Sequence, residues 1–342
     1  MCLGDWAMNR RQEDWKQYSR DQTRGKVTRH PGSARQIIVL DNCALNDILV
    51  CNPSGHLADD IRIAVLKEQM AVWTSPYLIT ETIAGSETDR LTARKKLDFL
   101  QVVSGGRMLK YPRRLLEWEG LNGRSPSDED RFMPHDEEKG IYEWSFAVCE
   151  AGGIVLDPED GSELSFKELV YRDKIAAQRA ASEAAEAAHK AVVRAFAAYS
   201  GRSEAGPDEM QYKAGARGGV DFPALGKWMR SISRTDFAGW VSRTLEQLGY
   251  KRTISGDDLP LFPHATSAAG YFLTEIAGNY ETGKKWKRND TYDLQYCVAA
   301  SQAGTLVTLD IDLQAQCAQM PYKSFRTSGI RELADLLAQS SQ

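Results

Sequence analysis

The residues of this sequence best suited to do chemistry are four acids, Asp41, Glu81, Asp293 and Asp310. Asp41 ends an apolar run that starts at Gln36, and Asp310 follows a second apolar run at 305–309. Short runs of this composition are typical of strands that are buried on both faces of a parallel sheet. Because the carboxyl ends of parallel strands share one edge of the sheet, we expect Asp41 and Asp310 to meet there.

The other two acids are expected at the same edge. Glu81 lies in a helix that follows the second predicted strand, and Asp293 lies in a helix that precedes the strand 305–309. Carboxylates gathered in one place repel one another, so that some take up protons or a divalent cation neutralises them. Since neither histidine nor thiolate accompanies these oxygen ligands, the pattern favours Mg²⁺ or Mn²⁺ over zinc.

The sequence around these acids alternates between strand and helix patterns. In the first part, strands are expected at 36–41, 72–75 and 107–110, and helices at 57–70, 77–85 and 88–103. Near the C-terminus, helices are expected at 290–303, 312–319 and 329–339, and strands at 305–309 and 325–327. This order predicts an α/β fold in which a central parallel sheet is flanked by helices.

A long stretch of different character separates these two parts. Residues 118–140 are rich in Asp, Glu, Gly, Ser and Pro and are expected to form a loop. Helices are expected at 141–151, 165–200, 221–250 and 265–282. The segment 165–200 contains neither Pro nor Gly, and as a helix it would be about 54 Å long. It therefore projects from a small sheet domain or packs against a partner helix.

The 342 residues divide into three parts on this basis. Residues 1–35 form a polar arm, disordered or with a short helix at about 4–20, that contains eight Lys or Arg and four Asp or Glu. The arm is a solvated tail or a contact for nucleic acid or a partner. Residues 36–110 and 284–342 form one split α/β domain, and residues 111–283 form a mostly α-helical insertion.

Three segments carry a family resemblance: DNCAL at 41–45, SPYLITETIAG at 75–85 and NDTYDLQYCVAASQAGTLVTLDIDL at 289–313. They resemble the three motif blocks of the PIN-domain nucleases. In that family an Asp follows strand one, a Glu lies in the second block, and a helix of the form D-x-x-hydrophobic-x-A-A leads into a strand ending V-T-x-D. The resemblance covers 36–110 and 284–340, and the block ending Val-Thr-Leu-Asp at 307–310 is its most specific part.

The resemblance implies a PIN-like fold and hydrolysis of a phosphodiester bond, most often in RNA. It implies one or two Mg²⁺ or Mn²⁺ ions, held by Asp41, Glu81, Asp293 and Asp310. Such a metal activates a water molecule as the nucleophile and stabilises charge on the scissile phosphate. The insertion of about 170 residues is far larger than in small toxin-like members, so the family implies nothing about the substrate channel.

Further roles follow from the same resemblance. Asp290 and Asp312 match positions at which many members carry extra acids, which would bind a second metal directly or through water. Thr308 matches a hydroxyl residue that would orient Asp41. Asn42 is a supporting candidate, although Asn42 and Cys43 stand where the family more often has small hydroxyl residues.

A basic cluster lies directly before the third block and consists of Lys284, Lys285, Trp286, Lys287 and Arg288. Cations around an aromatic ring suit contact with phosphates and a stacked base. The alternative is a solvated helix end next to a turn. Arg94 to Lys96 and Arg113 to Arg114 would extend the same basic surface.

Structural interpretations of the acids stand beside the catalytic one. Asp41 would cap a helix, Glu81 would be a surface acid near a helix start, and Asp310 would be a turn residue. Asp310 and Asp312 also resemble the D-x-D of haloacid-dehalogenase phosphatases, but they lie near the C-terminus instead of after the first strand. A Toprim-type interpretation leaves Asp41 and Asp293 without a role.

The sequence thus predicts a divalent-metal-dependent nuclease, an endoribonuclease with RNA preferred over DNA. The second hypothesis is a PIN-like scaffold or regulatory module, whose helical insertion binds a protein partner or a second copy with weak or no cleavage. Metal-dependent cutting that is lost in Asp41 and Asp310 variants would distinguish the two hypotheses.

Composition narrows the remaining possibilities. The net charge of -4 argues against a uniformly basic coat for nucleic acid, but it allows a local basic surface. The six cysteines contain no C-x-x-C pair, which suits a reducing cytosol. Neither a transmembrane run nor a signal-peptide core is present, so a cytoplasmic protein is expected. Cys43 and Cys297 are expected to be buried, and His189 to be exposed.

Overall fold

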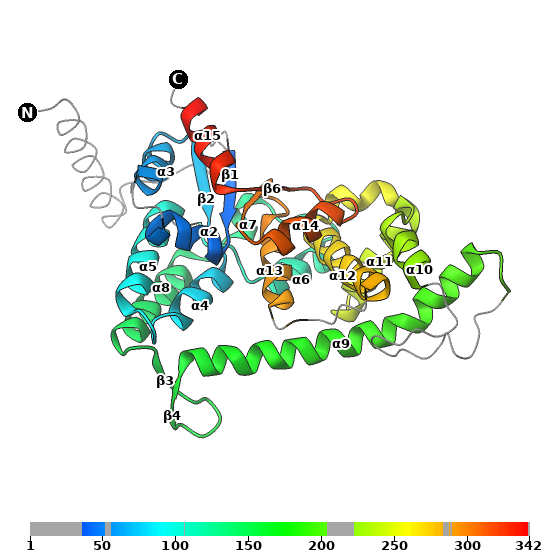
Figure 1. Cartoon of the computed structure of the whole chain (residues 1–342), viewed down its shortest axis with the longest axis horizontal. Coiled ribbons are helices and arrows are strands. Elements are labelled where there is room, and N and C mark those ends of the chain that lie inside the picture. The colour runs from blue at the N-terminus through cyan, green and yellow to red at the C-terminus, as the bar shows by residue number, and fades with distance from the viewer. Residues whose placement is uncertain are drawn as a thin grey trace, which may run out of the picture.

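The computed structural model describes residues 36–51, 56–105, 107–203, 222–282, 287 and 289–340. The arm predicted for 1–35 lies outside these residues. Within them the fold is α/β, and a parallel sheet has the strand order β2-β1-β5-β6 (Figure 1). Its strands are β1 (Gln36–Leu40), β2 (Met70–Trp73), β5 (Thr305–Val307) and β6 (Arg326–Ser328). The predicted α/β class with a central parallel sheet is confirmed.

The order of the strands creates a switch point between β1 and β5. From β1 the chain crosses over to β2 on one side, whereas β5 and β6 are added on the other side. All three pairings are parallel. In open α/β sheets, the point where the strand order reverses leaves a crevice at the carboxyl ends of the strands.

The helices around the sheet lie within a few residues of the predicted ranges, apart from the short α2 (Asn42–Asn46), which was not predicted. The others are α3 (His56–Leu66), α4 (Pro76–Ala84), α5 (Arg90–Ser104), α13 (Asp290–Ala300), α14 (Ile311–Gln319) and α15 (Ile330–Ser340). A π-helical turn, Asp47–Cys51, extends α2. Pro76 opens α4, and Ser75 caps this helix because its hydroxyl accepts a hydrogen bond from the Tyr77 amide.

The strand predicted at 107–110 does not form within the described residues. Met108 makes only an isolated parallel bridge to Thr74, and Leu109 makes an antiparallel bridge to Phe132. The segment is short because Pro112 begins the next helix almost at once. The central sheet therefore ends at β2 on this side.

The loop predicted at 118–140 is mostly helical. It contains the end of α6 (Pro112–Asn122), all of α7 (Asp128–Arg131) and the start of α8 (His135–Glu150). The polar residues that indicated a loop act at helix starts: Ser127 caps α7, and the first turn of α8 carries three acids. Ser and Asp stabilise the first amide groups of helices as well as turns, so composition alone misassigned the segment.

The long helix predicted at 165–200 is confirmed as α9 (Phe166–Tyr199), with Ser165 as its cap. An unpredicted hairpin, β3 (Ile154–Leu156) with β4 (Glu163–Ser165), precedes it. Beyond α9 lie α10 (Phe222–Arg230), α11 (Arg234–Gln247), a 3-10 turn (Gly256–Leu261) and α12 (Pro263–Thr282). The helical pattern predicted at 221–250 forms two helices, because Ser233 caps α11 and begins a new helix after α10.

Two apolar clusters support this arrangement, and α9 belongs to both. The first surrounds the sheet and includes Phe166 and Val170 from the start of α9. The second lies among α10, α11 and α12 and includes Val193 and Phe196 from its end. Figure 1 shows α9 (green) running past α4 and α13 toward α10, and it packs against all three helices. The helix is therefore fixed at both ends by separate cores.

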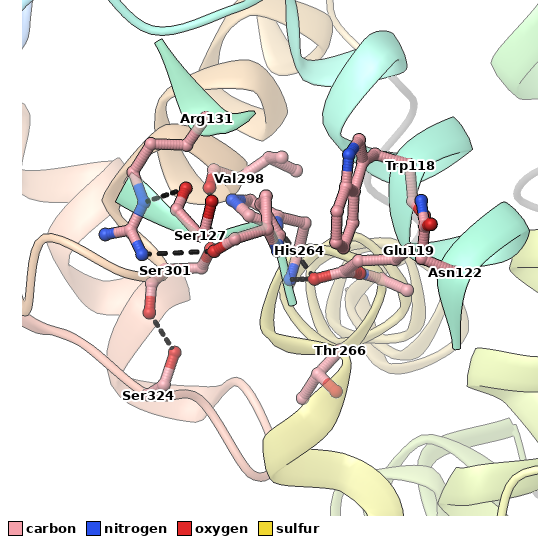
Figure 2. Close-up of polar contacts among 12 residues, drawn as sticks. Trp118, Glu119, Asn122, Ser127, Arg131, His264, Thr266, Val298, Ser301 and Ser324 are labelled. Carbon is pink, nitrogen blue, oxygen red and sulfur yellow. Dashed lines mark hydrogen bonds and ion pairs between the residues drawn. The ribbon is translucent and has the colours of Figure 1, made fainter. Parts of the chain in front are cut away.

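A buried acid joins α6 to α12 (Figure 2). Glu119 is 0% exposed and accepts hydrogen bonds from the backbone amides of His264 and Ala265 at 3.0 and 2.9 Å. Nδ1 of His264 lies 2.8 Å from the same carboxylate. These amides belong to the first turn of α12, where a negative charge is stabilised by the helix dipole. Glu119 therefore anchors the start of α12.

Two minor sequence predictions are wrong. His189 is buried, with Nδ1 2.6 Å from the hydroxyl of Tyr280, because α9 turns this face toward α12. Cys43 is exposed on the first turn of α2, whereas Cys297 is buried as predicted and lies 3.4 Å from the sulfur of Cys317. No helix in the described part of the chain has both the length and the hydropathy that crossing a bilayer requires.

Candidate active site

Asp41 lies at the carboxyl end of β1, directly at the switch point. Its backbone amide donates to the carbonyl of Val307 at 3.1 Å, which continues the pairing of β1 with β5. Its Oδ1 accepts a hydrogen bond from the Ala44 amide at 2.7 Å and caps α2. The capping interpretation of Asp41 is thus correct, but Oδ2 of the same carboxylate faces the neighbouring strand.

Thr308 links Asp41 to Asp310. Its hydroxyl donates a hydrogen bond to Oδ2 of Asp41 and accepts one from the Asp310 amide at 3.0 Å. Thr308 is fully buried, and its carbonyl accepts a further hydrogen bond from Nε2 of Gln314 at 2.6 Å. The hydroxyl therefore holds the ends of β1 and β5 together at the point where their acids lie.

Asp310 follows the end of β5 and caps α14. Its Oδ1 accepts a hydrogen bond from the Leu313 amide at 3.0 Å. Asp41 and Asp310 are thus built in the same way, each at the end of a central strand and each at the start of a helix. Two helix starts at one edge provide a partly positive environment for acids or for a bound anion.

Asp293 is held differently, on the first turn of α13. Among the described residues its carboxylate has neither a hydrogen-bond nor an ion-pair partner. Burial, the larger cause, and neighbouring carboxylates raise its pKa to about 8; the neighbours are Asp310, Asp290, Glu81 and Asp41. In the absence of a cation, Asp293 therefore holds a proton at neutral pH for most of the time.

The pKa of Asp41 is raised as well. Burial is the largest cause and raises it to about 6, although the hydrogen bonds from Ala44 and Thr308 oppose the change. The charges of Glu81 and Asp310 contribute in the same direction as burial. These mutual effects mean that the four predicted acids interact electrostatically in one place.

Glu81, on α4, is fully engaged by two donors. Nζ of Lys174 donates to its Oε1 at 3.0 Å, and the hydroxyl of Tyr296 donates to its Oε2 at 2.7 Å. Lys174 belongs to α9 and therefore reaches the site from the insertion. The side chains of Glu81 and Lys174 are 18% and 16% exposed, so that this pair lies at the rim.

The two second-rank acids differ in position. Asp290 is buried, and its Oδ2 accepts a hydrogen bond from the Lys287 amide at 2.6 Å, which fixes the turn before α13. Its charge acts on Asp293, so it lies beside the site. Asp312 is 80% exposed and forms an ion pair with Nζ of Lys287 at 3.5 Å. Asp312 therefore faces solvent.

Asn42, next to Asp41 in the sequence, makes a partly buried contact with α5. Its Oδ1 accepts a hydrogen bond from Nζ of Lys96 at 3.2 Å. Burial lowers the pKa of Lys96, whereas nearby Cys43 and Glu81 oppose that change. This lysine faces inward from α5 toward the start of α2, and it belongs to the basic segment that the sequence indicated.

Lys174 and Tyr296 were missed by sequence reasoning. Tyr296 lies three residues after Asp293, and helical spacing alone would have placed both on one face of α13. Lys174 had no comparable signal, since it is one of several cations on a charged helix. Of the predicted basic cluster, only Lys287 is among the described residues; Lys284, Lys285, Trp286 and Arg288 lie outside them.

The donor set can be compared with the needs of a divalent cation. In the described part of the chain, no three Asp, Glu, His or Cys side chains are arranged to hold a metal ion as they stand. The four acids nevertheless fit a divalent cation in ligand type and charge. Their carboxylate oxygens are the ligands that Mg²⁺ and Mn²⁺ prefer, a cation would relieve their mutual repulsion, and Asp293 has no other partner among the described residues. Closing a coordination shell would require rotation of these side chains.

Comparison of this chain with protein-family models, with curated proteins and with solved structures finds no match.

Proposed function

We propose that this protein is a divalent-metal-dependent nuclease of the PIN-like type that hydrolyses phosphodiester bonds, with RNA preferred over DNA. One observation carries the proposal: the Thr308 hydroxyl joins Asp41 to Asp310 at the switch point of the sheet. A cap needs no such link to the neighbouring strand. The preference for RNA follows only from the resemblance of the motif blocks to that family.

Three acids would hold the cation: Asp41, Asp293 and Asp310. A bound Mg²⁺ or Mn²⁺ would lower the pKa of a water molecule and stabilise charge on the phosphate. Asp41 keeps its orientation through Ala44 and Thr308, which leave its carboxylate oxygens at the strand end. Asp293 would give up its proton when the cation arrives, since the charged form is then favoured.

The other groups at the site would support binding of the substrate. The helix starts behind Asp41 and Asp310 direct backbone amides toward this edge, and such amides favour negative charge. The buried Asp290 fixes the turn that begins α13 and so positions Asp293. Glu81 lies at the rim of the site, where it binds Lys174 and Tyr296, so we place its role in holding these two neighbours.

The proposal is tested by incubating the full chain with single-stranded RNA and single-stranded DNA in Mg²⁺, Mn²⁺ or EDTA. We expect cutting that requires the metal. Asp41→Asn and Asp310→Asn should each lower the rate by at least about 100-fold, as expected for loss of a group that stabilises charge in the transition state.

A matched control is Asp136→Asn, which removes an exposed acid on the first turn of α8, outside the site. This variant should cut like the unmodified protein. The proposal would be overturned if the unmodified protein cuts neither nucleic acid in any metal. It would also be overturned if cutting persists unchanged in both site variants.

A further inference from the structure

We propose that Lys174 is a further catalytic residue of the nuclease: its ammonium binds the scissile phosphate at the rim of the acidic site, and Glu81 holds it there. This inference rests on the proposed function. Nothing in the motif blocks indicates it, because Lys174 lies 93 residues from Glu81 and 115 from Asn289.

Three site residues hold the ammonium. Nζ of Lys174 donates to Oε1 of Glu81 at 3.0 Å and to Oδ1 of Asn289 at 3.3 Å. It also lies 4.0 Å from the centre of the Tyr292 ring. Asn289 immediately precedes α13, and Tyr292 immediately precedes Asp293. The cation is therefore placed directly beside the helix turn that carries the unpartnered acid.

The contact between Lys174 and Glu81 is not needed to hold α9 in place. The position of α9 does not depend on this contact, because apolar residues already fix the helix at both ends. Val170, one turn before Lys174, is buried in the first cluster, and Val193 is buried in the second. The two apolar clusters thus hold α9 in the position that places Lys174 at the site.

The Lys174 ammonium has an N–H group available to bind a ligand. It carries three N–H donors, and two of them are directed at Glu81 and Asn289. The third has no oxygen acceptor among the described residues, and 16% of the side chain is exposed. Lys96 also lies near Glu81, but it is buried and bound to Asn42, so it cannot turn outward without losing that contact.

A phosphodiester needs such a cation here. Its negative charge is repelled by the acids at the strand ends, and a lysine ammonium binds phosphate oxygens as a point charge. Glu81 then serves as a positioning residue, since its two oxygens engage Lys174 and Tyr296. No proton transfer or covalent step is required of Lys174.

The test compares Lys174→Met and Lys174→Arg with Lys190→Met, which removes an exposed lysine from the same helix beyond the site. Cutting of single-stranded RNA is measured in Mg²⁺. Binding of a fluorescent RNA oligonucleotide is measured with Ca²⁺ in place of Mg²⁺, because Ca²⁺ takes the same oxygen ligands with looser geometry. Mn²⁺ affinity is measured by calorimetry without nucleic acid.

We expect Lys174→Met to cut about 100-fold more slowly, as for loss of one donor to the developing charge, and to bind the oligonucleotide more weakly. Lys174→Arg should recover part of both effects because it keeps the charge. Lys190→Met should behave like the unmodified chain. Mn²⁺ affinity of Lys174→Met should be equal to that of the unmodified chain or tighter, because a neighbouring positive charge is lost.

The outcomes separate this inference from the proposed function. If the unmodified chain cuts RNA and Lys174→Met cuts and binds equally well, the lysine inference is overturned and the nuclease stands. Faster cutting by Lys174→Met at limiting Mg²⁺ would also overturn it, because the lysine would then compete with the metal. If the unmodified chain does not cut RNA, the proposed nuclease function is overturned. Weaker oligonucleotide binding by Lys174→Met than by Lys190→Met would then still support a contact between Lys174 and phosphate. Equal binding by the two variants, or no binding by the unmodified chain, would overturn that contact.

Discussion

Thr308 donates a hydrogen bond to Oδ2 of Asp41, although the two residues are 267 positions apart in the sequence. The same hydroxyl accepts the Asp310 amide, so one buried oxygen connects the ends of two parallel strands. This bond opposes the rise in the pKa of Asp41 that burial causes. It therefore favours the charged carboxylate that a cation requires.

Replacing Thr308 with Val removes this bond while keeping the shape of the side chain. We expect the free energy of unfolding to fall by about 1–3 kcal/mol, because Asp41 and the Asp310 amide lose a buried partner. Mn²⁺ affinity should fall roughly 10- to 100-fold, as for other groups that orient a metal ligand. Urea unfolding and calorimetry measure the two effects. Thr308→Ser should retain both properties, and an unchanged Mn²⁺ affinity in Thr308→Val would contradict the role of the hydroxyl.

The raised pKa of Asp293 predicts a stability cost that grows with pH. Its folded-state pKa of about 8 exceeds the ordinary value of 3.8, so the folded chain binds more protons than the unfolded chain between these values. The contribution of Asp293 to the free energy of unfolding is therefore largest below about pH 4 and is lost as the pH rises toward 8. Asp293→Asn should raise the free energy of unfolding in EDTA by about 1–3 kcal/mol at pH 8 and by less at pH 5.

The comparison for this prediction is Asp312→Asn, which removes an acid that is 80% exposed. It should change stability little at either pH. Urea unfolding at pH 5 and pH 8 gives the free energy of unfolding of the unmodified chain, Asp293→Asn and Asp312→Asn. Destabilisation by Asp293→Asn at pH 8 would show that its carboxylate makes favourable contacts in the folded chain.

Binding of a divalent cation should release protons. Asp293 and Asp41, with pKa values of about 8 and about 6, are partly protonated in the cation-free chain and must ionise to act as ligands. Mn²⁺ affinity should therefore rise roughly tenfold per pH unit between pH 6 and 8 through Asp293, and Asp41 should steepen this rise only below about pH 6. Calorimetry in buffers of different ionisation enthalpy counts the protons released. A flat affinity across this range would argue against Asp293 as a ligand.

Glu119 should matter for stability and not for the acidic site. Glu119→Gln weakens a buried acceptor of two backbone amides and removes the charge beside His264. We expect a loss of about 2–4 kcal/mol in the free energy of unfolding, with unchanged Mn²⁺ affinity. Glu117→Gln, which removes an acid that is 35% exposed, is the control and should lose little. Equal effects of the two variants would refute the anchoring of α12 by Glu119.

Much of the α/β part follows from local sequence. Apolar runs at 36–40 and 305–307 indicate buried strands, and helices between such strands produce parallel pairing. Because parallel strands end at one edge, the sequence alone brought Asp41 near Asp310. The misassigned segment 118–140 shows the limit of composition, since Ser and Asp favour turns and helix starts alike.

Only the tertiary structure decided which side chains complete the site. Thr308 and Asp41 meet because β1 and β5 are neighbours, which strand patterns suggest but do not prove. Lys174 meets Glu81 because α9 is docked into two separate apolar clusters, and that docking sets which turn of a uniform charged helix lies over α4. Local periodicity reports which face of a helix is apolar, but the position of a helix along its neighbours depends on packing at both of its ends.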